Sequence, residues 1–301
     1  MINIKDTIIY LNTIQDFIVW TLDKFNSNNL YYGHGTNNVL DESLHLIMNS
    51  LLIPINLGKN IYKLNLTLQE RTLIIQRVVK RINKKIPVSY LTNKSYFCGL
   101  EFYIDNRVFI PRSPIGEIII NKFNKIKNPK NILDMCTGSG CIAISCAYVY
   151  PEAKIDAVDI SLNALSVAKK NIKIHGMQNR INTICSDLFE NINKKNIYDL
   201  IITNPPYLNN KEFNNLPLEF THEPLISLYS DINGFKCIKT ILLFSFIFLS
   251  KDGILICEVG NNIINIINIY PKLPFRWLKF KKGGYGVFLL YKKYLNFDKY
   301  F

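Results

Sequence analysis

Apolar residues recur at helical spacing through the first part of the chain. In residues 13–22 and 68–82 they fall three and four positions apart, which predicts two amphipathic helices. Asp41 stands where it could cap a third helix that runs toward Leu51 and ends before Pro54. We therefore expect residues 1–95 to form a small helical domain.

The pattern changes to strand spacing at residue 96. Residues 96–104 and 107–110 are rich in aromatic and branched side chains, and Asp105 and Asn106 separate them. Pro111 and Pro114 then end the pattern, because proline cannot donate to a strand ladder. We expect a β-hairpin with its turn at Asp105-Asn106, in which residues 96–112 connect the helical domain to a second domain at 113–301.

Short apolar runs alternate with helical patterns from about residue 115 onward. The alternation predicts an α/β fold, with a doubly wound parallel sheet that helices cover on both faces. Ligands of such sheets bind at the carboxyl ends of the strands, near the reversal in strand order. The residues that follow each run are therefore the candidates for a site. The predicted strands are residues 131–134, 154–159, 181–185, 198–203 and 253–259.

A glycine loop follows the first of these strands. Gly138 and Gly140 let the backbone turn sharply and approach a ligand closely, although an ordinary strand-to-helix turn can also contain two glycines. Asp159 closes the second strand, where a carboxylate can accept hydrogen bonds from both hydroxyls of a ribose or can cap the next helix. The pair favours a nucleoside cofactor. Asp134 suits one with a cationic centre and an amino-acid tail, such as S-adenosylmethionine.

The fourth predicted strand ends in a second motif, Asn204-Pro205-Pro206-Tyr207. The prolines make the turn rigid and leave the Pro205 carbonyl without a helical partner. The Asn204 side chain offers an amide oxygen beside it, and Tyr207 offers an aromatic face. Two acceptors and a flat surface can hold a planar group that carries an NH₂.

These motifs resemble those of the class I S-adenosylmethionine-dependent methyltransferases, whose fold is Rossmann-like. Within that group the chain resembles the protein-glutamine N5-methyltransferases over nearly its whole length. Relatives that act on release factors typically carry Pro-Arg-Pro-Glu-Thr-Glu after the hairpin and glycine in place of Cys136. This chain instead resembles the branch that acts on a glutamine of ribosomal protein L-three. The matching segments are residues 32–38, 90–94, 97–99, 110–117 and 135–140.

The resemblance implies a role for each motif residue. It implies that Asn204, Pro205, Pro206 and Tyr207 hold the substrate amide, with Asn204 also beside the cofactor, and that Phe109 and Arg112 line the same cleft. Asp187 would lie near the adenine, beside Leu188, where relatives often have an aromatic residue. The other residues implied to bind S-adenosylmethionine are Asp134, Cys136, Thr137, Gly138, Ser139, Gly140 and Asp159.

Three other functions remain open at this stage. A release factor presents the same glutamine amide, and an exocyclic amine of RNA or DNA presents the same donors. The helical domain is poor in arginine, which favours a protein substrate. A non-catalytic assembly factor could also keep this fold. His222 and Glu223 look like an acid/base pair, but Pro224 and the chemistry favour a structural role for them.

The charge of the chain bears on its partners. The formal net charge is +13, with 29 Lys, 7 Arg and 36 Asn, so A/T-rich codons explain the charge as well as a polyanionic partner does. Residues 251–301 alone carry 9 basic and 3 acidic groups. Within them, residues 279–286 form a predicted basic turn before a last strand, and either contact with ribosomal RNA or a solvated turn would account for it.

Cysteine usage and hydropathy bear on location. The seven cysteines contain no Cys-x-x-Cys pair, so we expect free thiols in a reducing cytoplasm and no metal site. The longest apolar stretch, residues 241–249, is shorter than the about 20 residues that a membrane helix needs. We expect a soluble cytoplasmic protein.

Overall fold

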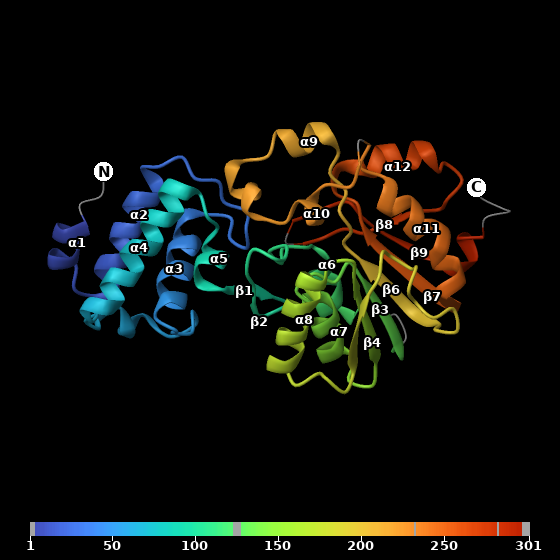
Figure 1. Ribbon diagram of the computed structural model, residues 1–301, viewed down its shortest axis with the longest axis horizontal. Helices are drawn as coiled ribbons and strands as arrows, with labels where there is room; N and C mark the ends of the chain where they lie inside the picture. Colours follow the sequence, from blue (N-terminus) through green and yellow to red (C-terminus); the bar gives the residue numbers. More distant parts are fainter. Residues whose placement is uncertain (1–3, 123–127, 232, 282, 297–301) are drawn as a thin grey trace. The chain divides into compact units, whose positions relative to one another are not determined.

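The computed structural model describes residues 4–122, 128–231, 233–281 and 283–296, and the chain forms two compact units (Figure 1). The first unit comprises Met1–Ser95, Ile104–Asn106 and Pro217–His222. The second comprises Tyr96–Tyr103, Arg107–Leu216 and Glu223–Phe301. The segment Pro217–His222 thus belongs to the helical unit although it follows the N-P-P-Y motif in the sequence, which the sequence pattern did not predict.

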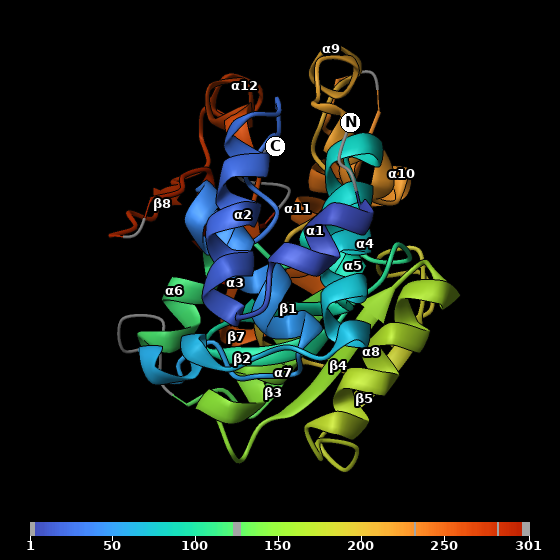
Figure 2. The ribbon, with the colours of Figure 1, turned by 90° about the vertical axis from the view of Figure 1, so that its left-hand side faces the viewer.

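The first unit is helical, as its apolar spacing predicts. Figure 2 shows α2, α3 and α4 packed side by side. Phe17, Leu46 and Ile75, one from each of these helices, are completely buried in their common core. The elements of this unit are α1 (Ile4–Tyr10), α2 (Ile14–Asn26), α3 (Val39–Ser50), the 3-10 helix η1 (Lys59–Lys63), α4 (Leu68–Lys84), α5 (Val88–Thr92) and the 3-10 helix η3 (Leu218–His222).

Side-chain caps determine where these helices begin. Thr67 starts α4 with a capping box, in which its hydroxyl accepts from the backbone N–H of Glu70 and the Glu70 carboxylate accepts from the N–H of Thr67. At α3, Asn38 is the cap, and its side chain accepts the N–H of Asp41 at 2.9 Å. The prediction that Asp41 caps this helix is wrong. Asp41 lies in the first turn, where its negative charge interacts favourably with the helix dipole and stabilises the helix.

The connecting hairpin is shorter than predicted. It consists of β1 (Lys94–Phe97) and β2 (Leu100–Tyr103), and its turn is Cys98-Gly99. Cys98 and Gly99 have φ angles of 52° and 77°, as the tight two-residue turns of hairpins require. The predicted turn at Asp105-Asn106 is wrong, and residues 107–110 form no strand. Non-glycine residues seldom adopt positive φ, so Cys98 gives no turn signal in the sequence.

The second unit contains a seven-stranded sheet in the order β5-β4-β3-β6-β7-β9-β8. Neighbours from β5 to β7 run parallel, while β9 is antiparallel to both β7 and β8. This is the strand arrangement of the class I methyltransferases, and the expected fold class is confirmed. The strands are β3 (Asn131–Met135), β4 (Lys154–Asp159), β5 (Ile181–Cys185), β6 (Tyr198–Thr203), β7 (Leu249–Glu258), β8 (Arg276–Trp277) and β9 (Val287–Tyr291).

Helices pack on both faces of this sheet. On one face, Leu133 of β3 and Ile201 of β6 form a core with Ile241 of α11. On the other, Asp134 of β3 accepts a hydrogen bond from Ala143 of α7. The α-helices of the second unit, whether or not they pack on the sheet, are α6 (Ile115–Ile120), α7 (Cys141–Val149), α8 (Leu162–Ile174), α9 (Asn210–Asn214), α10 (Leu225–Leu228), α11 (Lys236–Phe248) and α12 (Ile263–Ile269). Its 3-10 helices are η4 (Gly260–Asn262) and η5 (Lys292–Tyr294). No helix of the described residues combines the length and the apolar character that crossing a bilayer requires.

Candidate active site

Strand register brings the predicted site residues to one edge of the sheet. Thr203 of β6 pairs with Met135 of β3 on one side and with Cys257 of β7 on the other. Asp159 ends β4, which is the other neighbour of β3. The next residues along β3, β6 and β7 therefore lie at the same edge of the sheet as Asp159. They are Cys136, Asn204 and Glu258.

The glycine loop after β3 is tightly folded. Cys136, Gly138 and Gly140 have φ angles of 61°, 55° and 80°. The Thr137 N–H donates to the Val158 carbonyl at 2.9 Å, which holds the start of the loop against β4. The loop then runs into α7, for which Gly140 is the N-cap. Glycine permits such left-handed angles at little cost at positions 138 and 140, whereas Cys136 is a residue type that seldom adopts them.

Asp159 supports the glycine loop. Its Oδ2 accepts the N–H of Gly138 and its Oδ1 accepts the N–H of Ser161, both at 2.9 Å. Burial raises the pKa of Asp159, although these backbone hydrogen bonds oppose the rise. Ser161, and not Asp159, caps α8. Because a carboxylate oxygen accepts more than one hydrogen bond, both oxygens retain capacity for ribose hydroxyls.

Asp134 lies beneath the loop and is completely buried. Its Oδ2 accepts from the Thr137 hydroxyl at 2.5 Å and from the Ala143 N–H at 3.0 Å, which ties the loop to the first turn of α7. Its Oδ1 is buried without a hydrogen-bond partner among the described residues. Burial raises the pKa of Asp134 to about 7. The structure thus gives Asp134 a loop-bracing role that the sequence did not predict.

The turn after β5 carries the two residues implied to lie near adenine. Asp187 is exposed, and its role toward adenine stays a prediction. Leu188 has a φ angle of 46° and is buried with Val158 and Ile238 in the core beside α11. The Leu188 side chain therefore serves packing, and its role toward adenine stays a prediction.

Asn204 follows β6 with an unmet hydrogen-bonding group. Its Oδ1 is buried and has no hydrogen-bond partner among the described residues. A buried acceptor without a donor costs about 1–3 kcal/mol, so an arriving N–H is stabilised there. Thr203 beside it is fixed, since its hydroxyl donates to the Met135 carbonyl at 2.8 Å. The arrangement suits recognition of a group that donates hydrogen bonds.

The end of β7 holds Tyr207 in three ways. The Tyr207 hydroxyl donates to Glu258 Oε1 at 3.1 Å, and the Tyr207 carbonyl accepts from Asn262 Nδ2 at 2.8 Å. Its ring lies against Gly260, where an added Cβ would fall on the ring atoms. Burial, followed by the charge of Glu258, raises the pKa of Tyr207. Sequence reasoning missed these partners, because they lie more than fifty positions away along the chain.

Phe109 and Arg112 lie together in the segment between the hairpin and α6. The Arg112 guanidinium stacks on the Phe109 ring, 3.8 Å from its centroid. Two nitrogens of Arg112 donate to the two oxygens of Glu223, each at 2.6 Å. Glu223 Oε1 also accepts the N–H of Ile110 at 2.9 Å. Glu223 thus positions Arg112, which supports the structural interpretation of that residue.

Arg112 is also close to the N-P-P-Y motif. Its positive charge acts on both Tyr207 and Glu258, lowering the pKa of each against the larger effect of burial. The next residue, Ser113, donates its hydroxyl to Glu258 Oε2. The structure therefore brings the predicted cleft residues and the predicted catalytic motif to one place.

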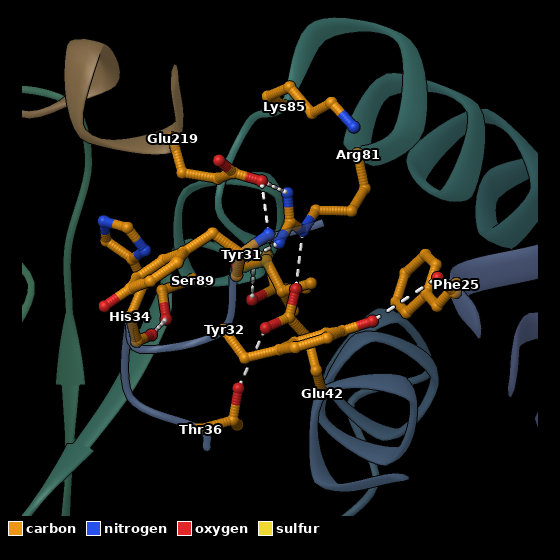
Figure 3. A network of polar contacts seen from close by, with 12 residues as sticks. Phe25, Tyr31, Tyr32, His34, Thr36, Glu42, Arg81, Lys85, Ser89 and Glu219 are labelled. Carbon is orange, nitrogen blue, oxygen red and sulfur yellow. Dashed lines mark hydrogen bonds and ion pairs between the residues drawn. The ribbon is translucent and has the colours of Figure 1, made fainter. Parts of the chain in front are cut away.

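The loop at residues 32–38 is held by buried charges in the helical unit (Figure 3). Arg81 donates to Glu42 at 2.5 Å, to Glu219 at 2.9 Å and to the Tyr31 carbonyl at 2.7 Å. The Thr36 hydroxyl donates to Glu42 at 2.9 Å, so Thr36 and Tyr31, the residue before the loop, bind the same cluster. Burial tends to raise the pKa of Glu219, but the Tyr31 N–H and Arg81 outweigh it and lower that pKa.

Two histidines of this unit have structural positions. His34 is 5% exposed and packs on Phe220, with ring centroids 4.5 Å apart. His222 donates from Nε2 to the Lys84 carbonyl at 2.7 Å. Neither arrangement is that of a general base.

Comparison with known proteins decides the family. The chain is 40% identical over 306 residues to the ribosomal protein uL3 glutamine methyltransferase of Francisella tularensis subsp. tularensis (strain SCHU S4 / Schu 4), covering 99% of this chain and 97% of the relative. The chain belongs to the uL3 glutamine methyltransferase family. A second member, from Neisseria gonorrhoeae (strain ATCC 700825 / FA 1090), is 38% identical over 291 residues, with 95% and 96% covered. The resemblance inferred from the motifs is confirmed.

Two broader likenesses accompany this family membership. The family model described as Methyltransferase small domain matches residues 115–224, which include the glycine loop and the N-P-P-Y motif. The crystal structure of a methyltransferase from Pyrococcus furiosus is 14% identical, covers 75% of this chain and 99% of that one, and has a TM-score of 0.47. The fold assignment rests on the strand order above.

Members of this family depend on S-adenosylmethionine, and the residues at the sheet edge fit that cofactor. Among the described residues, leaving aside Gly138 and its two chain neighbours, no heavy atom lies within 4 Å of a Cβ placed on Gly138, so a ligand can approach the backbone there. The Ser139 hydroxyl is buried without a hydrogen-bond partner among the described residues. Asp159 and Asp187 lie at the ends of the two following strands, where a ribose and a base would continue from the loop.

The cysteines carry free thiols throughout. Cys141, Cys146 and Cys257 are buried, whereas Cys185 is exposed. Burial raises the pKa of the Cys136 thiol well above its ordinary value, which makes it a weak nucleophile. Within the described residues, no three His, Cys, Asp or Glu side chains gather as a metal site would require.

Proposed function

We propose that this protein methylates the N5 nitrogen of a glutamine side chain in ribosomal protein uL3, the L-three protein of the large subunit. Its family membership supports this substrate. The observation that carries the chemistry is the buried Asn204 Oδ1, an acceptor without a donor at the end of β6. S-adenosylmethionine supplies an electrophilic methyl group when it is bound at the glycine loop.

The residues at the sheet edge orient a poor nucleophile. The lone pair of an amide nitrogen is delocalised into its carbonyl, so a site must hold the group in a reactive geometry. Asn204 Oδ1 and the Pro205 carbonyl accept the two amide N–H bonds and direct the lone pair toward the methyl donor. Tyr207 packs along the amide plane. After alkylation the nitrogen loses its proton readily, so the site needs no strong base before attack.

The same residues would suit two other substrate classes. A release factor presents an identical amide, and an exocyclic base amine presents two similar N–H donors. The test therefore offers each class separately. Purified enzyme is incubated with isotope-labelled S-adenosylmethionine and with uL3, release factors or ribosomal RNA, and mass spectrometry locates the label. We expect one methylated glutamine in uL3, and label only in nucleic acid would contradict the proposal.

A variant at Asn204 tests the proposed chemistry. We expect Asn204→Ala to lower the turnover number about 100-fold or more, because the substrate amide loses one of two acceptors. Its Kd for S-adenosylmethionine, measured by calorimetry, should change less than about threefold. Asn210→Ala, an exposed asparagine six positions later, is the control and should keep full turnover. Full turnover by Asn204→Ala would exclude this mechanism.

The basic end of the chain supports a finer proposal about the partner. Lys272, Arg276, Lys279 and Lys281 are exposed, and three of them line a groove of about 1070 Å³ in the second unit. Of the predicted basic turn, Lys282 lies outside the described residues. We propose that this surface contacts ribosomal RNA, so that the preferred substrate is uL3 in an assembling large subunit in the cytoplasm. Glutamine at all four positions should then slow methylation of assembling particles and leave that of free uL3 unchanged.

A further inference from the structure

The carboxylate of Glu258 joins two segments that the site requires. Its Oε1 accepts the hydroxyl of Tyr207, from the N-P-P-Y motif, at 3.1 Å. Its Oε2 accepts the hydroxyl of Ser113, which follows Arg112 just before α6. Glu258 is 5% exposed, so water does not compete for these bonds. A single side chain therefore fixes the position of both segments.

Neighbouring contacts show how closely this carboxylate is held. Glu258 is the last residue of β7 and pairs with Val287 of β9. Its strand neighbour Cys257 pairs with Thr203, so Glu258 and Asn204 are the next residues along adjacent strands. Burial raises the pKa of Glu258, and the two hydroxyls and the charge of Arg112 oppose that rise. Charged hydrogen-bond acceptors bind hydroxyls about twice as strongly as neutral ones do, and the effect is larger away from water.

We infer that Glu258 is a positioning residue for methyl transfer: it holds Tyr207 and the Arg112-Ser113 segment in the geometry that receives the substrate amide. The inference rests on the proposed function. Glu258 acts through Tyr207 and Ser113 and contacts no reacting atom. Its removal should therefore change turnover more than it changes binding of the cofactor. The glycine loop that would bind the cofactor follows β3 and contacts β4.

The experiment compares variants of the full chain. Glu258→Ala should lower the turnover number about 100-fold with uL3, while the Kd for S-adenosylmethionine changes less than about threefold. Glu258→Gln should recover turnover to within about tenfold of the native enzyme, because an amide can accept one hydroxyl and donate to the other. Asp252→Asn, an exposed carboxylate on the same strand, is the matched control. Native turnover by Glu258→Ala, or equal losses in both Glu258 variants, would overturn the inference.

If Glu258→Ala does not fold, two other variants test the inference, Ser113→Ala and Tyr207→Phe. Each deletes one hydroxyl, and the remaining one still holds the carboxylate. The double variant should therefore lose more turnover than the product of the two single losses, and independent effects would count against the inference.

The same variants separate this inference from the proposed substrate. If the native enzyme methylates another protein, the uL3 assignment fails, and the turnover ratios on that protein decide the role of Glu258. If it methylates none, unfolding temperatures decide. The shift of the double variant should then exceed the sum of the single shifts, and additive shifts would overturn the inference.

Discussion

Arg81 and Arg112 make the same kind of bond in different surroundings. Each guanidinium binds a buried carboxylate from one short stretch of chain, Glu219 for Arg81 and Glu223 for Arg112. The Arg81 side chain is 1% exposed, and all three of its nitrogens are bound within the helical unit. The Arg112 side chain is 19% exposed and stacks on Phe109 beside the N-P-P-Y motif.

The difference in exposure separates structure from recognition. An arginine that is enclosed with its carboxylates cannot reach a ligand, and its loss leaves charges unpaired. A partly exposed arginine that its carboxylate holds in place can still offer a fixed donor or a flat cation to a substrate. We therefore expect loss of Arg81 to affect stability and loss of Arg112 to affect turnover.

The largest expected effect tests the enclosed side of the comparison. Arg81→Met leaves Glu42 and Glu219 buried without their cation, so the free energy of unfolding should fall by about 3–5 kcal/mol. Trp20 lies in the helical unit and Trp277 in the other, and the chain has 2 Trp. In a Trp277→Phe background, tryptophan fluorescence during urea unfolding therefore reports the unit that contains Arg81.

Lys80→Met is the control for this variant, because Lys80 is exposed on the same helix. It should change the free energy of unfolding by no more than about 0.5 kcal/mol. If the two variants unfold alike, the cluster in Figure 3 contributes nothing net to stability, and burial does not distinguish the two arginines.

Asp134 extends the comparison to a buried carboxyl that has no arginine. Burial raises its pKa to about 7 from 3.8. The raised pKa means that protonation of Asp134 stabilises the folded protein relative to the unfolded chain. This contribution to the free energy of unfolding is complete below pH 3.8 and is lost as the pH rises through about 7. The cofactor-free protein should therefore lose up to about 1.4 kcal/mol per pH unit across this window.

Asp134→Asn should make that slope shallower, since an amide accepts the same hydrogen bonds and does not titrate here, while Asp159 and Glu258, whose pKa values burial also raises, keep their part of it. Urea unfolding at a series of pH values, with Trp277 as reporter in a Trp20→Phe background, measures the slope. Asp252→Asn, exposed on β7, should keep the native slope. Parallel curves for native protein and Asp134→Asn would show that Asp134 stays ionised.

Local patterns in the sequence predicted most of the sheet. The strands 154–159, 181–185 and 198–203 appear with the predicted bounds, because short apolar runs between turns identify buried strands. The convergence of the glycine loop with Asn204 followed from a general property of parallel sheets, in which loops at the carboxyl ends meet.

Contacts between distant parts of the chain could not be predicted in this way. Glu258 looks like an ordinary strand end, and its partner Ser113 is 145 positions away. Glu223 was interpreted as loop structure, but nothing in the sequence connects it with Arg112. The hairpin turn was misplaced because Asp105-Asn106 has typical turn composition, whereas Cys98 adopts a positive φ that its residue type seldom takes.

The smallest expected effect tests the exposed side of the comparison. Arg112→Lys keeps the charge but loses the planar group that binds both oxygens of Glu223 and stacks on Phe109. We expect kcat/KM for methylation of uL3 to fall about tenfold, which corresponds to about 1.4 kcal/mol. The Kd for S-adenosylmethionine should stay within about threefold of the native value, because the glycine loop keeps its contacts.

Arg107→Lys is the matched control, since Arg107 donates to the Ser166 hydroxyl of α8 at 2.9 Å. It should keep native kcat/KM. If Arg112→Lys also keeps native kcat/KM but unfolds more easily, Arg112 serves structure as Arg81 does. The 19% exposure of its side chain would then reflect only its position at the rim of the site. If Arg112→Lys lowers kcat/KM and leaves the free energy of unfolding unchanged, arginine–carboxylate pairs serve two purposes in this protein. The enclosed pair of Arg81 then stabilises the fold, and the partly exposed pair of Arg112 supports turnover.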